Sequence, residues 1–158
     1  MARAYIGLGA NLGDMALTLR AALKALDALP RTRVEAVSSA WRSAPVDAGG
    51  PDYLNAVARL ETELEPEPLL DALQAIELTH GRERPYVNAP RTLDLDLLLY
   101  DDQHVHTARL TVPHPRLHER SFVLRPLLEV APERQDLAAH LPAVADQALQ
   151  KLSLNLQP

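Results

Sequence analysis

The sequence predicts an α+β fold, a sheet with helices packed on it, that forms one domain over residues 1–158. The first observation is the composition: 158 residues, 47% hydrophobic and 23% charged, suit one globular domain with a sizeable core. The second is that some segments alternate apolar and polar residues, whereas others repeat apolar residues at helical spacing. The third is the order of these segments, βαββαβ followed by helices, which favours a sheet covered by helices.

The first half of the chain contains a strand, a helix and a second strand. Residues 4–10 predict a buried strand, and Asp14 in the following turn can cap a helix over residues 16–29. Pro30 ends that helix because proline cannot continue it. Residues 33–41 alternate and predict the second strand.

The rest of the chain is expected to add further strands and helices. Residues 93–100 are the strongest strand candidate in the chain. The other expected elements are a Pro- and Gly-rich loop at 43–51, a strand at 53–63, a helix at 67–80, an Arg- and Pro-bearing loop at 81–92, a short strand near 109–112, and helical segments at 116–129 and 141–152.

Composition excludes several functional classes. Without cysteine, the chain has no disulfide, thiolate metal site or cysteine nucleophile. No apolar run approaches the roughly 20 residues that span a bilayer, and the N-terminus leads directly into a strand, so we expect a cytoplasmic protein without membrane contact. A net charge of −5 argues against nucleic-acid binding, which needs a broad basic face.

The basic residues are nevertheless concentrated. Seven arginines lie between positions 82 and 125, namely Arg82, Arg84, Arg91, Arg109, Arg116, Arg120 and Arg125. In an acidic protein, a local arginine cluster suits a phosphorylated small molecule, because the planar guanidinium matches phosphate oxygens. The alternative interpretation is a solvated arginine-rich face.

Asp94 and Asp96 are the clearest candidate metal ligands. Side chains alternate across a strand, so the two carboxylates share one face while Leu93, Leu95 and Leu97 take the other. Paired carboxylates repel unless cations neutralise them, and hard oxygen ligands suit Mg²⁺ bound together with substrate phosphates. An edge strand whose aspartates face water is the alternative.

The loop before this strand carries Arg82, Arg84 and Arg91. Guanidinium groups beside metal-binding carboxylates are typical of phosphoryl transfer, where they neutralise developing charge. An ion pair between Arg91 and Asp94 would explain the proximity without any function.

Several further residues are candidates with structural alternatives. His114 lies between two prolines and could donate to a phosphate or fill a turn. Asn55 shares a strand face with Tyr53 and could form hydrogen bonds with a heterocycle that has an amide-like edge. Tyr53 and Phe122 could stack on the faces of that ring, although Phe122 could equally pack in the core. The glycine-rich segment 7–13 matches no phosphate-binding motif, so Gly7 and Gly9 are expected to let another backbone approach closely.

Taken together, these segments resemble the 6-hydroxymethyl-7,8-dihydropterin pyrophosphokinase family of the folate pathway. The resemblance covers most of the chain, through residues 5–14, 38–45, 51–56, 77–82, 90–96 (Pro-Arg-Thr-Leu-Asp-Leu-Asp), 110–114 and 120–127. The segment 87–89 departs from the family, which often has a basic residue followed by Trp-Gly there; Tyr86 could replace the missing aromatic.

The resemblance implies a ferredoxin-like βαββαβ core with additional C-terminal helices, in a single three-layer domain. It implies transfer of pyrophosphate from ATP to the pterin hydroxymethyl group, with release of AMP, by a monomer. By analogy Asp94 and Asp96 hold two Mg²⁺ ions and Arg82 and Arg91 act on the phosphates. The implied ATP-binding residues are Gln74, Arg84, Arg109, Thr111, His114 and Arg120, and the implied pterin-binding residues are Ser43, Val46, Tyr53, Asn55 and Phe122.

Two other functions remain open at this point. One is a metal-dependent nuclease or phosphatase that uses Asp94, Asp96 and His114, although the chain lacks a basic track for a polymer. The other is a non-catalytic nucleotide-binding module, which the presence of both aspartates and both loop arginines disfavours.

Overall fold

An antiparallel sheet of six strands forms the centre of the computed structural model, which describes residues 1–11, 14–44, 52–80, 93–154 and 156. Its strands are ordered β5-β1-β4-β3-β8, and β2 also pairs with β4. Their bounds are β1 Ala2–Ala10, β2 Thr32–Val37, β3 Ala40–Ser43, β4 Tyr53–Thr62, β5 Asp94–Tyr100 and β8 Leu149–Leu152. The strands β6 (Val105–His106) and β7 (Thr111–Val112) form a separate two-stranded sheet.

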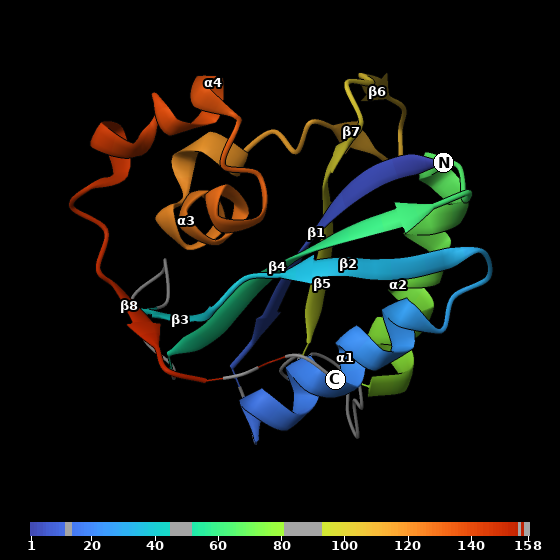
Figure 1. Cartoon of the computed structure of the whole chain (residues 1–158), viewed down its shortest axis with the longest axis horizontal. Coiled ribbons are helices and arrows are strands. Elements are labelled where there is room, and N and C mark those ends of the chain that lie inside the picture. The colour runs from blue at the N-terminus through green and yellow to red at the C-terminus, as the bar shows by residue number, and fades with distance from the viewer. Residues whose placement is uncertain (12–13, 45–51, 81–92, 155, 157–158) are drawn as a thin grey trace.

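Helices cover both faces of the main sheet (Figure 1). On one face, α1 (Met15–Asp27) and α2 (Pro66–His80) bury apolar side chains against β1, β4 and β5. On the other face, α3 (Ser121–Val130) packs with the 3₁₀ helix η1 (Leu117–Glu119), α4 (Gln135–Ala138) and the 3₁₀ helix η2 (Leu141–Val144). Each face therefore has its own apolar core, as alternating side chains require.

The first helix begins and ends close to its predicted bounds. The Asp14 side chain accepts a hydrogen bond from the Leu17 amide at 3.1 Å, which satisfies one of the unpaired donors of the first turn. Leu19, Leu23 and Leu26 are fully buried, as their helical spacing predicts. The helix ends at Asp27, before Pro30.

The predicted strand over residues 33–41 is interrupted in the structure. Residues 38 and 39 separate β2 from β3, and both strands pair with β4. The Ser38 hydroxyl accepts a hydrogen bond from the Val57 amide at 2.9 Å and donates one to the Ser39 carbonyl at 2.8 Å. A side chain that bonds its own neighbouring backbone competes with regular pairing, and the alternation of residues does not reveal this.

The predicted helix over residues 141–152 is wrong. The 3₁₀ helix η2 occupies residues 141–144, and β8 at 149–152 pairs with β3, with Ala40 opposite Leu152. Apolar residues at 141, 144, 149 and 152 are compatible with helical spacing, but pairing satisfies the backbone groups along the open edge of β3. The predicted helix at 116–129 is also divided, into η1 and α3.

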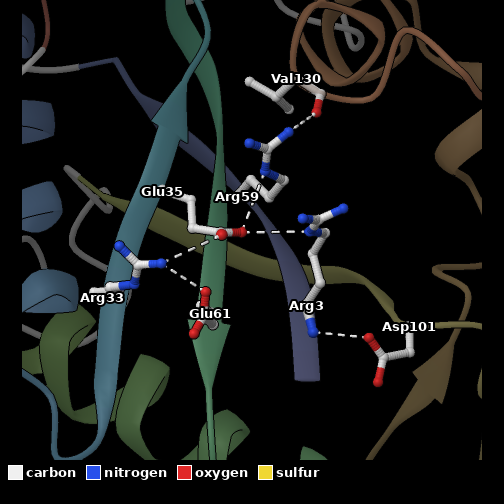
Figure 2. A network of polar contacts seen from close by, with 7 residues as sticks. All are labelled: Arg3, Arg33, Glu35, Arg59, Glu61, Asp101 and Val130. Atoms are coloured by element: carbon white, nitrogen blue, oxygen red, sulfur yellow. Dashed lines mark hydrogen bonds and ion pairs between the residues drawn. The ribbon is translucent and has the colours of Figure 1, made fainter. Parts of the chain in front are cut away.

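One end of the sheet face beside α3 carries a network of charged side chains (Figure 2). The carboxylate of Glu35 lies 3.3 Å from the Arg3 guanidinium and 3.4 Å from that of Arg59, and Arg33 bonds Glu61 at 2.8 Å. Arg59 also donates to the carbonyl of Val130 at 2.9 Å, which joins the end of α3 to the sheet. Within the part of the chain that the structure describes, no helix is both long and apolar enough to cross a membrane.

Candidate active site

A row of residues runs across three neighbouring strands on the sheet face beside α3. In the strand pairing Gly9 of β1 lies opposite both Asp94 of β5 and Asn55 of β4. Because neighbouring strands lie about 4.8 Å apart, two strand spacings separate Asp94 from Asn55 by roughly 10 Å. Glycine carries no side chain, so the space above Gly9 is open between a carboxylate and an amide.

A cavity of about 350 Å³ lies above this row. Leu93, Leu95 and Leu97 are buried in the opposite core, which confirms that Asp94 and Asp96 share the cavity face. The residues that line the cavity are Gly7, Leu8, Gly9, Asn11, Ser43, Ala44, Tyr53, Asn55, Ala56, Val57, Asp94, Asp96, Leu98, Arg120, Phe122 and Val123. The two predicted metal ligands therefore line the same cavity as four of the five predicted pterin-binding residues, namely Ser43, Tyr53, Asn55 and Phe122.

The amide of Asn55 is held by β3. Its Nδ2 donates hydrogen bonds to the Trp41 carbonyl at 3.1 Å and to the Ser43 Oγ at 2.8 Å, and the residue is only 4% exposed. A carbonyl can only accept, so Nδ2 must face Trp41 and the orientation of the amide is determined. Among the described residues, Oδ1 accepts no hydrogen bond, and it lies toward Gly9, 3.6 Å from where a Cβ would stand. Asn55 therefore offers the cavity only an acceptor, and the prediction that a ligand satisfies both its donor and its acceptor is wrong for the donor.

Arg120 and Phe122 enter the cavity from the start of α3. The guanidinium carbon of Arg120 lies 5.6 Å from the centroid of the Phe122 ring, within the range of a cation–π contact. Both side chains also line a second hollow of about 370 Å³, together with Arg116 and Gln147. Phe122 therefore faces open space rather than the core, which was the alternative interpretation of this residue.

A third hollow, of about 290 Å³, contains most of the predicted ATP-binding residues that the structure describes. Arg109, Thr111 and His114 line it, and Asp96 lines both this hollow and the main cavity. The Arg109 guanidinium donates to Asp71 of α2. Gln74 is exposed on α2, one turn after Leu70, which also lines this hollow.

The surroundings of His114 favour its neutral form. Burial lowers the pKa of its imidazole, while the nearby carboxylate of Asp96 acts in the opposite direction. Its Nδ1 accepts a hydrogen bond from the Arg116 amide at 3.2 Å, and its own amide donates to the Leu98 carbonyl at 2.9 Å. A neutral imidazole that accepts at Nδ1 carries its proton on Nε2, which makes that atom a donor.

The carboxylates of Asp94 and Asp96 fit a hard divalent cation. Both side chains face the same cavity, and oxygen ligands of this kind suit Mg²⁺, which commonly takes one or two carboxylates and completes its shell with phosphate oxygens and water. No group of three or more His, Cys, Asp or Glu side chains that could hold a metal occurs among the described residues. Two carboxylates on one cavity fit an ion whose remaining ligands are substrate phosphates and water.

Glu77 belongs to the site region but was not among the residues predicted from the sequence to act there. This carboxylate is buried at the last turn of α2 and accepts a hydrogen bond from the Leu95 amide at 2.8 Å, between the two aspartates. Its position four residues after the buried Leu73 could have revealed it, because a glutamate on the apolar face of a helix needs a polar partner.

The remaining predicted site residues, Arg82, Arg84, Arg91 and Val46, lie outside the described residues. His104 and His106, which could mimic a metal pair by spacing, are both exposed.

Paired carboxylates next to a hollow lined by Arg, Thr and His are residue types used by enzymes that transfer phosphoryl groups. The comparisons with known proteins identify the family. The model of the 7,8-dihydro-6-hydroxymethylpterin-pyrophosphokinase family matches residues 5–132, and the chain belongs to this family. The resemblance inferred from the sequence motifs is thereby confirmed.

Individual relatives agree with this assignment. The 2-amino-4-hydroxy-6-hydroxymethyldihydropteridine pyrophosphokinase of Pseudomonas aeruginosa is 48% identical over 142 residues, which cover 89% of this chain and 88% of the relative. The enzyme of the same name from Haemophilus influenzae is 44% identical over 159 residues, 97% of this chain and 99% of the relative.

A solved structure described as HPPK-DHPS in complex with substrates has a TM-score of 0.72 at 11% identity; the match covers 92% of this chain and 44% of that longer chain. At that identity the likeness concerns the fold alone. It supports the expected α+β domain, with helices on an antiparallel sheet.

Proposed function

We propose that this chain transfers pyrophosphate from ATP to the hydroxymethyl group of 6-hydroxymethyl-7,8-dihydropterin, giving the pterin diphosphate and AMP in folate biosynthesis. The main support for this proposal is the match to the family model over residues 5–132. The chain is accordingly an ATP-dependent pyrophosphokinase. The row Asp94–Gly9–Asn55 supports this function, because it leaves room for a planar ring between an amide and the candidate metal ligands.

The pterin occupies the cavity above Gly9. Asn55 Oδ1 accepts a hydrogen bond from an N–H donor of the ring, since both donors of Nδ2 are used by Trp41 and Ser43. Tyr53 and Phe122 stack on the ring, which suits aromatic side chains that line one cavity. Backbone groups of Ser43 and Val46 complete the recognition; Val46 enters this proposal through the family resemblance alone.

ATP occupies the neighbouring hollow. Arg109 and Thr111 contact the nucleotide, and His114 donates from Nε2 to a phosphate oxygen, as a neutral imidazole bonded at Nδ1 can. Arg120, which lines the main cavity, binds phosphate at the junction of the two substrates. Gln74 and Arg84 complete the set by resemblance to the family.

Asp94 and Asp96 would hold two Mg²⁺ ions together with ATP, with Asp96 at the point where the two hollows meet. When bound, such ions would supply positive charge that neutralises the phosphates during transfer. The carboxylates orient the phosphate chain toward the pterin. Arg82 and Arg91 stabilise the transferred group, a role that the family resemblance implies.

The finer architecture is part of the same proposal. A ferredoxin-like core within a single three-layer domain over residues 1–158 is supported by the strand order β5-β1-β4 with β2 and β3 on β4, and by helices on both faces. The monomeric state and the cytoplasmic location remain predictions from the sequence.

The test is to incubate the protein with ATP, Mg²⁺ and 6-hydroxymethyl-7,8-dihydropterin and to separate the nucleotides by chromatography. We expect AMP and pterin diphosphate in equal amounts, and no AMP when the pterin is omitted. ADP as the product would indicate transfer of one phosphoryl group, and the absence of any pterin-dependent product would refute the proposal.

A further inference from the structure

The side chain of Gln147 joins two backbone groups on either side of Arg120. Its Oε1 accepts a hydrogen bond from the Ser121 amide at 2.9 Å, and its Nε2 donates one to the Glu119 carbonyl at 2.9 Å. Gln147 lies in the segment between η2 and β8, at least 26 residues from these partners. One amide side chain thus bridges the end of η1 and the start of α3.

This bridge replaces a local helix cap. Arg120 occupies the N-cap position of α3, and its side chain makes no capping hydrogen bond. The first amides of a helix have no partner within the helix, and arginine has no acceptor with which to satisfy them. Gln147 supplies the acceptor for Ser121 from a distant part of the chain. The short η1 ends at the same place, so this contact ties the end of η1 to the start of α3 on either side of Arg120.

The junction carries two side chains of the candidate active site. Arg120 and Phe122 flank Ser121 and both line the main cavity. Gln147 is their neighbour, because all three line the second hollow of about 370 Å³. Gln147 also precedes β8, whose partner β3 contains Ser43, the residue that accepts a hydrogen bond from Asn55. The bridge therefore connects the two sides of the cavity.

We propose that Gln147 is a positioning residue for the pyrophosphokinase reaction, which holds Arg120 and Phe122 in the orientation that both substrates need. The inference rests on the proposed function, in which Phe122 stacks on the pterin and Arg120 binds phosphate. Gln147 touches neither substrate. It acts through the backbone on either side of Arg120.

The experiment compares Gln147→Ala, Gln147→Glu and the control Gln150→Ala. Gln150 is an exposed glutamine of β8 whose side chain makes no hydrogen bond with the described residues. Because Gln147→Ala removes both hydrogen bonds that hold this junction, we expect it to weaken pterin and ATP binding by roughly tenfold each. Gln147→Glu retains the acceptor for Ser121 and should recover part of this loss. Gln150→Ala should bind both substrates as the unchanged protein does.

A double-mutant cycle separates positioning from a general loss of stability. In a Phe122→Ala background, the ring that Gln147 orients is gone, so adding Gln147→Ala should change pterin affinity by less than about twofold. An equal loss of affinity in both backgrounds would overturn the proposal. If Gln147→Ala does not fold, the same cycle with Gln147→Glu gives the answer.

These variants also distinguish failure of the proposed substrate site from failure of the positioning role of Gln147. If Phe122→Ala and Arg120→Ala each leave substrate binding unchanged, the proposed site is wrong. If they weaken binding while Gln147→Ala does not, the site stands and the role of Gln147 is refuted.

Discussion

Asn55→Leu removes a side-chain amide that makes two hydrogen bonds within the ligand-free protein. Nδ2 donates to the Trp41 carbonyl at 3.1 Å and to the Ser43 Oγ at 2.8 Å, at a position that is 4% exposed. A typical hydrogen bond contributes about 1 kcal/mol net, and a buried partner left unpaired costs about 1–3 kcal/mol. A leucine side chain at this position would keep most of the volume, so we expect the free energy of unfolding to fall by about 2–3 kcal/mol.

The measurement is urea-induced unfolding of the ligand-free protein, followed by calorimetric titration with the pterin. The exposed amide of Gln103 provides a control, since Gln103→Leu makes the same chemical change outside the cavity. We expect the control to change neither quantity, and Asn55→Leu to lose both stability and pterin affinity. If Asn55→Leu weakened pterin binding with no loss of stability, the hydrogen bonds to β3 would not contribute as argued here.

Three further predictions concern the metal ligands, the arginine-bearing loop and the charged network. Asp96→Asn should lower AMP formation by at least about a hundredfold at fixed Mg²⁺, while Asp102→Asn, an exposed control in a turn, should not; equal rates would refute the metal assignment. Arg82→Ala should slow the single-turnover rate much more than it weakens ATP binding, and the reverse split would identify Arg82 as a ground-state contact. The hydrogen bond from Arg33 holds the pKa of Glu61 below its ordinary value of 4.5. The stability that this pair contributes is therefore present above pH 4.5 and is lost as the pH falls and Glu61 becomes protonated. Arg33→Met removes the pair, so the decline of Tm on acidification should become less steep.

Much of the fold follows from periodicity alone. The strand at 93–100, with Leu93, Leu95 and Leu97 buried and both aspartates on the other face, matches its prediction because alternation is a local property. The first helix matches because its cap and its apolar stripe are encoded within the helix. The C-terminal segment does not, because β8 exists only where β3, which lies far earlier in the chain, offers an open edge. Such pairing between distant segments leaves no mark in local spacing.

The same distinction applies to the site. Asn55 could be chosen from the sequence because a polar side chain on a buried strand face needs partners. That its donors are taken by Trp41 and Ser43 could not be known, since this depends on the register of β3 against β4. Gln147 could not be found either, because its partners lie in a different segment and its surroundings in the sequence are ordinary for a turn.

The glycines of β1 show how the sheet makes room for the proposed chemistry. They were expected to allow close approach of another backbone, but a Cβ at Gly7 would meet the Leu98 side chain at 3.5 Å, and one at Gly9 would meet Asn55 Oδ1 at 3.6 Å. These are ordinary contact distances, so backbone crowding does not require glycine at either position. What glycine provides is space, because a larger side chain at Gly9 would stand between Asn55 and Asp94 in the row across the three strands. The opposite face of β1 buries Ile6 and Leu8 in the core, so one strand can support the fold on one face and leave its other face open for a ligand.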